Sequence, residues 1–176
     1  MNIQKSKTLG DWWQLYRLYL SAFPAAERKP FSMILRMCRK GKTDIWCVRS
    51  DGNFAGLAIT INGPDLILLD YFAIKKRRRG EGIGTKALSL LRSHYTGKGF
   101  FVEIETTLKE TPELPMRLRR KKFYLAAGLQ ELSVTAKLFG VDMELLGMDC
   151  SLDYAGYKAF YRDNYNQWAA NHIEPR

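Results

Sequence analysis

Residues 66–95 of this chain combine an apolar run, a glycine-rich turn and an amphipathic segment, and this combination restricts the fold more than any other part of the sequence. The run Leu66–Ile74 is typical of a buried strand. The turn Arg-Gly-Glu-Gly-Ile-Gly follows at residues 79–84, and apolar residues recur at helical spacing from Ile83 to Tyr95. A strand, a glycine turn and a helix in this order direct several backbone N–H groups toward one point, at the positive end of a helix dipole. The pattern therefore predicts a site for a phosphate or diphosphate group.

The length and apolar content of the chain are typical of one soluble domain. Its 176 residues, 46% of them apolar, are enough for a full hydrophobic core. No apolar stretch approaches the ~20 residues of a membrane-spanning helix, and the polar N-terminus does not lead into a signal-peptide core. We expect a single domain over residues 1–176, with a core in 1–140 and a C-terminal strand and helix extension in 141–176. We also expect a cytoplasmic location and no membrane partner.

The positive charge is concentrated in the first 140 residues. The formal net charge of the chain is +10. Residues 141–176 hold three Lys or Arg and six Asp or Glu, a net charge of −3, so residues 1–140 carry +13. Such an excess attracts polyanions. Nucleic acid and a small cofactor with several phosphates are therefore the two partners to distinguish.

The cysteines and histidines do not form a metal-binding pattern. Cys38, Cys47 and Cys150 lie far apart, and the two histidines, His94 and His172, share no ligand spacing with them. We expect no metal, and we expect the cysteines to be buried free thiols. A Ser-His-Asp or Cys-His catalytic unit stays open at this point, but no residue pattern supports one.

The rest of the chain alternates between helical and extended patterns. Helical patterns cover residues 12–20, 30–41, 83–95, 112–127 and 152–171, and extended patterns cover 44–49, 54–61, 66–74, 100–107 and parts of 129–147. Short turns at residues 51–53 and 62–65 join the first three extended segments into an antiparallel meander. This order indicates an α+β or mixed α/β domain, without internal repeats.

Two common nucleotide-binding motifs do not fit residues 79–84. A P-loop ends in Gly-Lys-Ser/Thr, whereas Gly84 is followed by Thr85 and Lys86. A dinucleotide-binding fingerprint has glycines at offsets 0, 2 and 5, whereas the glycines here lie at offsets 0, 2 and 4. The meander before the turn also differs from the βαβ unit of that fingerprint. The pattern that remains is Arg-x-x-Gly-x-Gly between a strand and a helix.

This pattern resembles the acetyl-CoA pyrophosphate loop of the GNAT-type N-acetyltransferase superfamily. The similarity extends over residues 73–84, from Ala73-Ile74 at the strand end through Arg79 to Gly84. Residues 120–129, Arg-Lys-Lys-Phe-Tyr-Leu-Ala-Ala-Gly-Leu, are similar to a second signature of that family, a helix that ends in Phe-Tyr-x-x-x-Gly-Phe. Leu129 replaces the usual final Phe. The two signatures occur in the family's order, and the resemblance covers roughly residues 1–135.

The resemblance implies a fold, a co-substrate and a set of binding residues. The fold would be a central, mixed, mostly antiparallel sheet flanked by helices on both faces, with a C-terminal helix. The co-substrate would be acetyl-CoA, without a metal. The residues that match the family's binding positions are Phe72, Ala73, Ile74, Arg79, Gly80, Glu81, Gly82, Ile83, Gly84 and Thr85. The basic residues at 75–79 and 117–122 could attract a further phosphate of CoA, or form a solvated face or a nucleic-acid patch.

Transfer of an acetyl group to an amine has two proton requirements: the ammonium must lose a proton and the CoA thiolate must gain one. Tyr124 matches the family's general acid, and a tyrosine with a pKa of ~10 can donate to a thiolate whose acid has a pKa of ~8.5. Glu103 and Glu105 lie on one face of the expected strand before that helix. Either could take the amine proton or hold a cationic substrate, or both could simply pair with basic residues. Glu105, nearer the strand end, is the preferred base.

The sequence does not name the acceptor. Where the first two helices meet, Glu27-Arg28 is a candidate specificity pair among the aromatic residues Trp12, Trp13, Phe23 and Phe31. We expect an N-acetyltransferase that acts on a small-molecule or peptide amine and could form a homodimer. The alternatives are a basic nucleic-acid-binding module and a CoA-binding regulator without catalysis. Nucleic acid is disfavoured, because its binding needs no Gly-x-Gly turn and no strand carries an aromatic RNA-binding signature.

Overall fold

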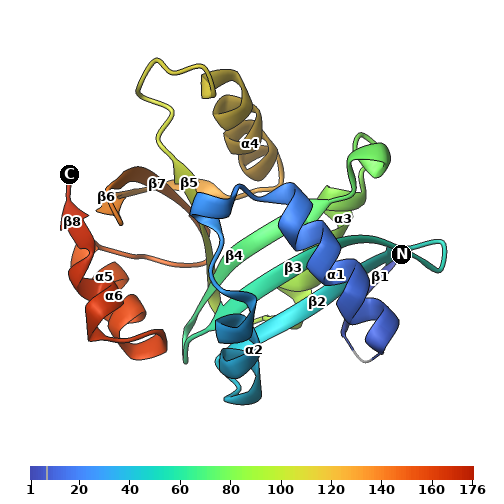
Figure 1. Cartoon of the computed structure of the whole chain (residues 1–176). Helices are drawn as coiled ribbons and strands as arrows, with labels where there is room; N and C mark the ends of the chain where they lie inside the picture. The colour runs from blue at the N-terminus through green and yellow to red at the C-terminus, as the bar shows by residue number, and fades with distance from the viewer. Residues whose placement is uncertain (7) are drawn as a thin grey trace. The chain divides into compact units, whose positions relative to one another are not determined.

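Eight strands form one sheet in the order β1-β2-β3-β4-β5-β7-β6-β8 (Figure 1). The structure is a computed structural model that describes residues 1–6 and 8–176. The strands are β1 (Asn2–Lys5), β2 (Thr43–Ser50), β3 (Asn53–Asn62), β4 (Leu66–Ile74), β5 (Gly99–Glu105), β6 (Gln130–Leu138), β7 (Val141–Met148) and β8 (Ile173–Pro175). The β4–β5 pair is parallel, and the pairs β1–β2, β2–β3, β5–β7, β6–β7 and β6–β8 are antiparallel. The prediction of a mixed, mostly antiparallel sheet is therefore confirmed.

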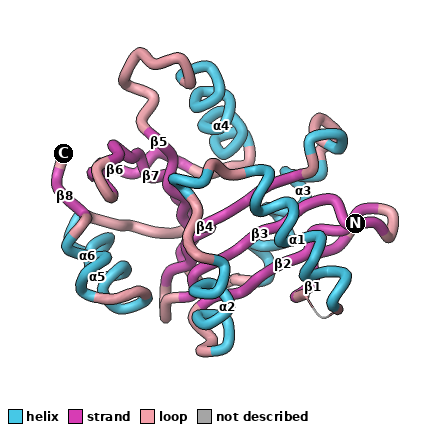
Figure 2. The backbone as a smooth tube through the Cα atoms, in the orientation of Figure 1, coloured by secondary structure: helices cyan, strands magenta, loops and turns pink. Residues whose placement is uncertain are grey.

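Six α-helices and two short 3₁₀ helices are described beside the sheet (Figure 2). They are α1 (Leu9–Ala22), η1 (Ala25–Glu27), α2 (Phe31–Arg39), η2 (Lys76–Arg78), α3 (Ile83–His94), α4 (Leu114–Ala126), α5 (Tyr154–Asn164) and α6 (Gln167–Asn171). The contacts divide the chain into two compact units. Unit 1 comprises Met1–Asn62 and Leu69–Thr96, and unit 2 comprises Gly63–Leu68 and Gly97–Arg176. Strand β4 contributes residues to both units.

In unit 1, helices cover both faces of the sheet. Successive strand residues point to opposite faces, and accordingly Cys47 and Ala73 belong to one hydrophobic cluster whereas their neighbours Val48 and Ile74 belong to another. The first cluster contains residues of α1 and α2, and the second contains Ile83 and Ala87 of α3. Figure 1 shows α1 and α2 in front of β2–β4 and α3 behind them. The expected flanking helices are therefore present.

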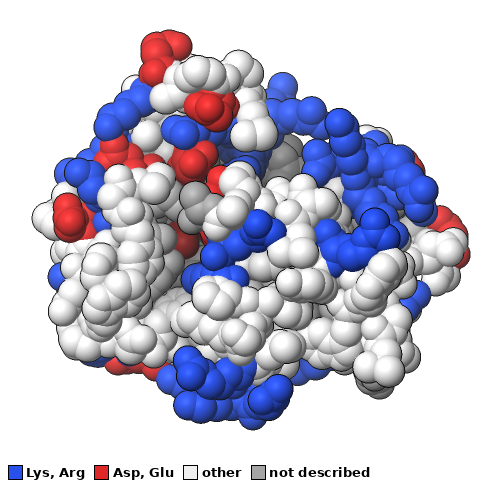
Figure 3. Space-filling view, viewed as in Figure 1, with Lys and Arg blue, Asp and Glu red and all other residues white. Residues whose placement is uncertain are grey.

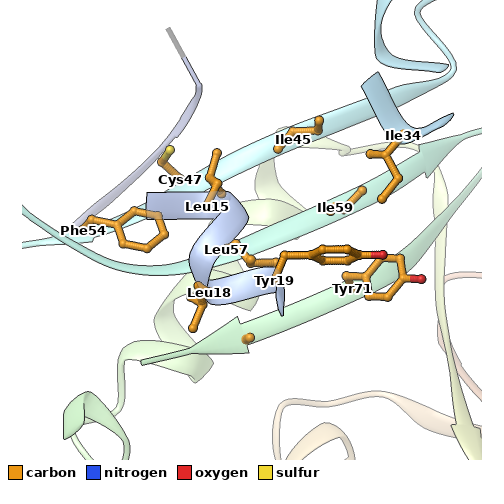
Figure 4. Packing of buried hydrophobic residues seen from close by; sticks show 11 residues of the cluster. Leu15, Leu18, Tyr19, Ile34, Ile45, Cys47, Phe54, Leu57, Ile59 and Tyr71 are labelled. Carbon is orange, nitrogen blue, oxygen red and sulfur yellow. The ribbon is translucent and has the colours of Figure 1, made fainter. Parts of the chain in front are cut away.

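Helix α1 is fixed at its start by a cap and along its length by an apolar stripe. Thr8 accepts a hydrogen bond from the N–H of Asp11 at 3.1 Å, and the Asp11 carboxylate accepts one from the N–H of Thr8 at 3.3 Å. This capping box pairs two N–H groups that a helix start would otherwise leave unpaired. Leu15 and Tyr19, one turn apart, are buried against the sheet (Figure 4). The helix thus carries Tyr19 to the end of β4, where its ring lies 4.9 Å from that of Tyr71.

Two glycine-dependent features shape the sheet of unit 1. The β2–β3 hairpin turns at Asp51 and Gly52, whose φ angles of 53° and 76° belong to a two-residue turn that matches the twist of paired strands. Gly56 of β3 permits a close approach, because a Cβ at this position would lie 2.5 Å from the carbonyl oxygen of Ala73. The C-terminal part of β4 therefore lies closer to β3 than a side chain would allow.

Unit 2 is built on β5, β7 and β6 with α5 packed against them. The ring of Phe101 on β5 lies 5.1 Å from that of Phe160 on α5. Helix α4 is attached differently: among its residues, all of which the structure describes, Tyr124 alone is buried. It ends in a Schellman motif, in which the N–H of Leu129 donates to the Tyr124 carbonyl and the N–H of Gly128 donates to the Leu125 carbonyl. Gly128, the glycine of the second family signature, has a φ of 92° and takes the position that ends this helix.

Three sequence-based expectations about elements need correction. The helical pattern at 152–171 is two helices, because Asn166 is extended and its side chain accepts a hydrogen bond from the N–H of Ala169 and so begins α6. The extended segment 100–107 ends at Glu105, because the Thr106 side chain and the Thr107 N–H bind Glu144. The short strands β1 and β8, at the two edges of the sheet, were not expected.

Candidate active site

The glycine turn lies in unit 1 between η2 and α3, and its backbone faces open space. Gly80 and Gly82 have φ angles of 87° and 72°, which residues with a side chain adopt only with strain. No heavy atom of the described residues lies within 4 Å of the place that a Cβ would take at either glycine. Ile83, in contrast, is buried among Val48, Ala55 and Ile74. The turn is thus anchored on one side and accessible to a ligand on the other.

The backbone N–H groups of the turn and of the first turn of α3 are available as donors. The first N–H after Gly82 that meets a backbone acceptor is that of Lys86, which donates to the Gly82 carbonyl at 3.1 Å. In the described part of the chain, the backbone hydrogen bonds of turns, loops and helix caps include none that is donated by an N–H of residues 80–85. A helix start leaves its first N–H groups unpaired and carries a partial positive charge. The arrangement fits an anionic oxygen, and the binding of a phosphate here stays a prediction.

The basic residues beside the turn have distinct roles. The Arg79 Nε donates to the Ile74 carbonyl at 3.1 Å and so ties the arginine to the end of β4. This bond does not use the two terminal nitrogens of the guanidinium. The Arg78 Nε lies 2.8 Å from Glu81, and another nitrogen of Arg78 lies 3.4 Å from Asp51. The hydrogen bond to Glu81 raises the pKa of Arg78. Arg78 thus offsets the negative charge that Glu81 brings into the turn.

Lysine and arginine side chains gather at two places on the visible face of unit 1 (Figure 3). One lies over η2 at the right and the other over α2 at the bottom. The first continues from the glycine turn, and there burial and the neighbouring charges of Arg77 and Arg78 lower the pKa of Lys75. A concentration of positive charge next to unpaired N–H groups favours a ligand with more than one phosphate.

The three residues Phe72, Ala73 and Ile74 form the end of β4, directly before the turn. Ala73 and Ile74 are buried, and Phe72 is half-buried against the cluster that contains Ile83. The Ala73 carbonyl is the group that Gly56 accommodates, and the N–H of Lys75 donates to the Ala55 carbonyl at 2.8 Å. These contacts fix the backbone between the strand and the turn. All the predicted cofactor-binding residues therefore lie in one continuous part of unit 1.

Tyr124 lies in unit 2 on α4 and is buried, with 7% of its surface exposed. Its ring lies 5.1 Å from that of Phe123. Burial raises the pKa of Tyr124 to about 12, against a smaller lowering by the charge of Arg120. The phenol is thus fully protonated at neutral pH, which is the state that a proton donor needs.

Glu103 on β5 is held by two tyrosines of α5. The Tyr157 hydroxyl donates to its Oε1 at 2.7 Å, and the Tyr161 hydroxyl donates to both carboxylate oxygens at 2.8 and 3.0 Å. The two tyrosines are buried. These partners, more than fifty residues away in the sequence, were not predicted. The one signal that could have found them is the spacing of four residues that places both hydroxyls on one face of an amphipathic helix.

Glu105, two residues further along β5, has a different partner. Its Oε2 lies 2.9 Å from Nε of Arg117 on α4, and Arg117 also donates to the Thr106 carbonyl at 3.4 Å. Both predicted carboxylates therefore lie on the strand where they were expected, and each has a hydrogen-bonding or ionic partner. Arg117, one of the basic residues considered for a CoA phosphate, pairs with Glu105 in this structure.

A buried carboxylate of unit 2, Glu144 on β7, was not predicted from the sequence. Lys121 lies 2.7 Å from Glu144 and 2.8 Å from Glu131, and the N–H of Thr107 donates to Glu144 at 2.5 Å. Although burial acts in the opposite direction, the hydrogen bonds from Lys121 and Thr107 lower the pKa of Glu144. The network joins β5, α4, β6 and β7. Lys121 is thus part of an internal ion pair.

The residues considered for the acceptor site have several roles in unit 1. Phe23 and Phe31 pack against Tyr19, with ring distances of 5.7 and 5.5 Å, whereas Trp13 is exposed under the guanidinium of Arg17. Trp12 is partly buried against the same cluster. Arg28 donates to the Leu20 carbonyl at 3.3 Å and the Glu27 carbonyl accepts from the Tyr71 hydroxyl at 2.9 Å. The Glu27-Arg28 pair therefore lies at a fixed point of the connection between α1 and α2.

The described residues contain neither a metal-binding cluster nor a helix suited to span a membrane. No group of three or more His, Cys, Asp or Glu side chains in residues 1–6 and 8–176 could hold a metal ion. The three cysteines are free thiols, with Cys47 buried and the other two half-buried. Within the same residues, none of the helices is both long and apolar enough to cross a membrane.

Comparison with known proteins adds an independent line of support. The family model of the acetyltransferase (GNAT) family matches residues 12–116, more than half of the chain, and includes the glycine turn and β5. A search of curated proteins finds no significant match.

Solved structures share the fold at low sequence identity. A GNAT-family protein from Bacteroides thetaiotaomicron has a TM-score of 0.79 at 18% identity, covering 95% of this chain and 99% of that one. An acetyltransferase from Bacillus subtilis in complex with CoA has a TM-score of 0.61 at 14% identity, covering 85% and 98%. The ribosomal-protein-S18-alanine N-acetyltransferase from Escherichia coli has a TM-score of 0.61 at 15% identity, covering 86% and 95%.

The matched family model, the mixed sheet with helices on both faces and the glycine turn before α3 lead to the same assignment. The predicted resemblance is confirmed: this chain belongs to the acetyltransferase (GNAT) family.

Proposed function

We propose that the protein is an N-acetyltransferase that moves the acetyl group of acetyl-CoA to a primary amine, of a small molecule or a peptide, by direct attack. The observation that carries this proposal is the glycine turn, where unpaired N–H groups and two glycines with positive φ form a cradle at a helix start. A diphosphate fits such a cradle. The B. subtilis acetyltransferase, which has a similar fold, was solved in complex with CoA, a molecule that contains a diphosphate.

The chain's own residues would bind the co-substrate in two ways. The N–H groups of Gly80–Thr85 and the terminal nitrogens of Arg79 would hold the diphosphate, and Thr85, which is exposed, could add its hydroxyl. The backbone of Phe72, Ala73 and Ile74 would pair with the extended arm that carries the thioester. Because these are backbone contacts, they require a fixed strand end, which the close approach to Gly56 provides.

Two protons move in the proposed reaction. The acceptor ammonium loses one before its nitrogen forms a bond to the acetyl carbon, and the sulfur gains one when the C–S bond breaks. We assign the donation to Tyr124, which is protonated throughout the neutral range because burial raises its pKa to about 12. A buried thiolate is also a stronger base than one in water, because burial disfavours its charge. Burial thus raises the pKa of the donor and of the acceptor alike, and Tyr124 keeps its proton until the C–S bond breaks and the sulfur takes it.

We assign the acceptance of the amine proton to Glu105, directly or through a water molecule. Glu103 is the second candidate, but two tyrosine hydroxyls already donate to it. Those hydroxyls occupy both oxygens of the Glu103 carboxylate, which leaves less room for an amine proton. Glu105 has one ionic partner, at Oε2. Substitution of each by glutamine should separate them: the acidic limb of the pH–rate profile should disappear in the Glu105→Gln variant and persist in the Glu103→Gln variant.

A titration with acetyl-CoA followed by a turnover assay tests the proposal. Acetyl-CoA should raise the melting temperature, because a ligand that binds only the folded state stabilises it. The release of free thiol should then be measured with a panel of amines that includes a polyamine, a lysine derivative and a peptide with N-terminal alanine. The peptide is chosen because the E. coli relative in fold acts on the alanine of a ribosomal protein. No shift with acetyl-CoA would defeat the proposal.

Two alternatives give different results in the same experiment. A nucleic-acid-binding module would be stabilised by an oligonucleotide and not by acetyl-CoA. A CoA-binding regulator would be stabilised by acetyl-CoA but would release no thiol with any amine of the panel. A homodimer and a cytoplasmic location stay predictions, which sedimentation and cell fractionation would test.

A further inference from the structure

Asp70, on β4 in unit 1, is a buried carboxylate with only one of its two oxygens paired. Its side chain is 6% exposed, and Lys29 Nζ lies 2.5 Å from Oδ1. Oδ2 is enclosed and has no hydrogen-bond partner among the described residues. Asp70 lies two residues before Phe72, at the start of the segment proposed to hold the thioester arm. It has no role in the chemistry described above.

The surroundings of Asp70 are rigid. The Tyr71 hydroxyl donates to the Glu27 carbonyl at 2.9 Å and accepts from the N–H of Lys29 at 3.0 Å, and the Tyr19 hydroxyl donates to the Lys29 carbonyl at 2.9 Å. Figure 4 shows Tyr19 and Tyr71 side by side, with both hydroxyls pointing the same way. These bonds hold the connection between α1 and α2 against the strand, so Lys29 reaches Asp70 from a fixed backbone.

This environment suits an alkylammonium group. Lys29 presents such a group to Oδ1, and the same Nζ lies 5.5 Å from the centre of the Tyr71 ring. A carboxylate beside an aromatic face is an arrangement that stabilises a cationic amine. A buried carboxylate oxygen without a donor is costly. A second ammonium at Oδ2 would remove that cost, because it would supply the missing hydrogen-bond donor.

We propose that Asp70 Oδ2 binds the acceptor amine in its cationic form, while Lys29 occupies Oδ1. The inference rests on the proposed function and narrows its substrate class to amines that arrive as ammonium ions. A local carboxylate matters for such a substrate, because the chain as a whole carries +10 and repels cations. Oδ2 is enclosed in this structure, so the amine reaches it only when side chains around it shift, while the hydrogen-bonded backbone of the connection stays in place.

A comparison of n-butylamine with n-butanol, its uncharged counterpart of similar size, tests this inference on the CoA-loaded full chain. The wild-type protein should be stabilised more by the amine than by the alcohol. Asp70→Asn should lose this preference, with the KM for n-butylamine raised roughly 10- to 100-fold, the factor expected for one charge-assisted hydrogen bond. Asp65→Asn, an exposed aspartate near the start of the same strand, is the matched control and should behave as wild type.

A purely structural role for Asp70 predicts something else. If the carboxylate only fastens the connection, then Lys29→Met should lose the preference for the amine just as Asp70→Asn does. Under our proposal, Lys29→Met keeps it. If Asp70→Asn does not fold because it leaves Lys29 with an uncompensated charge, the double variant Lys29→Met/Asp70→Asn removes both charges and should fold without the preference.

The results separate this inference from the proposed function. A wild-type protein that n-butylamine stabilises no more than n-butanol would overturn the inference, as would an Asp70→Asn or double variant that keeps the preference. Thiol release with any amine of the panel would, in either case, leave the proposed acetyltransferase function intact. A wild-type protein that fails to bind acetyl-CoA would instead overturn the proposed function itself.

Discussion

At the scale of single residues, the side chains assigned to chemistry differ from ordinary surface groups because each is buried or held by named partners. Tyr124 is buried and has a raised pKa, Glu103 accepts from two tyrosines, and Asp70 pairs through one oxygen. Burial and pairing fix the position of each group, and burial also keeps the Tyr124 phenol protonated. The contacts in the resting protein therefore limit the roles that these residues can have.

Replacement of Tyr124 by phenylalanine should lower kcat by about 10²-fold, the lower range for loss of a general acid. The acetyl-CoA-induced rise in melting temperature should persist, because the diphosphate cradle lies elsewhere. In the wild type, no alkaline limb from Tyr124 should appear below about pH 11, because its pKa is raised to about 12. Steady-state kinetics across pH would check both statements. Tyr16→Phe, at an exposed tyrosine, is the control, and equal losses in both variants would contradict the assignment.

Glu144 should make folding stability depend on pH. Its pKa is lowered in the folded state, so its contribution is present above the unfolded pKa of about 4.3 and is lost as the pH falls through the folded pKa. Urea unfolding between pH 6 and pH 3 should therefore show a smaller loss of stability in Glu144→Gln than in wild type. The variant should also be less stable at neutral pH, because Lys121 loses one of its partners. Parallel curves for the two proteins would contradict this expectation.

At the scale of elements, one residue at the N-terminus of α3, Gly82, both sets the backbone conformation of the turn and leaves N–H groups open for a ligand. Gly82 has φ of 72° and is the N-cap of the helix, although it has no side chain to cap it. The N–H groups that a capping side chain would pair are therefore left for a ligand. The absence of a capping side chain makes the start of α3 less stable on its own, and the same absence leaves its N–H groups open to a diphosphate.

Gly82→Ala should destabilise the protein by about 1 kcal/mol, because alanine adopts positive φ with strain. The KM for acetyl-CoA should rise as well, because the new methyl group projects into the open side of the turn. Thermal unfolding and kinetics would measure the two effects. Gly10→Ala in α1, where φ is not positive, is the matched control and should be neutral or slightly stabilising.

The sequence predicted the elements with strong local signals, and the structure confirmed them. The glycine turn, Pro30 before α2 and Gly128 after α4 act within a few residues of their own position. Strands β1 and β8 were missed because four and three residues carry too little periodicity, and each forms only beside a partner distant in the sequence. The tyrosines that hold Glu103 were missed for the same reason. Pairing partners depend on tertiary structure, which no local pattern contains.

At the scale of the whole molecule, the two compact units raise the question of cooperativity. Strand β4 is shared between the units. Its first three residues, with the turn before them, belong to unit 2 as part of Gly63–Leu68, and its residues from Leu69 onward belong to unit 1. A continuous strand cannot unfold in one unit without disturbing the other. We therefore propose that residues 1–176 unfold as a single domain.

The distribution of tryptophans permits a direct measurement. Unit 1 contains Trp12, Trp13 and Trp46, and unit 2 contains only Trp168, which is 63% exposed. Fluorescence of Trp168→Phe thus reports unit 1 alone, whereas far-ultraviolet circular dichroism reports the whole chain. A single domain requires the same urea midpoint from both signals. Two separate midpoints would show that the units unfold independently.

The close approach at Gly56 also bears on how such sequences can diverge. Gly56 contacts no ligand in any of the proposals, yet a methyl group there would collide with the Ala73 carbonyl, on the backbone proposed to hold the thioester arm. Every substitution at this position would displace that backbone. In a comparison of many relatives, a site of this kind should be as invariant as a catalytic residue, although its constraint comes from the spacing of two strands. Invariance at Gly56 would therefore record the geometry of β4 and not a reaction.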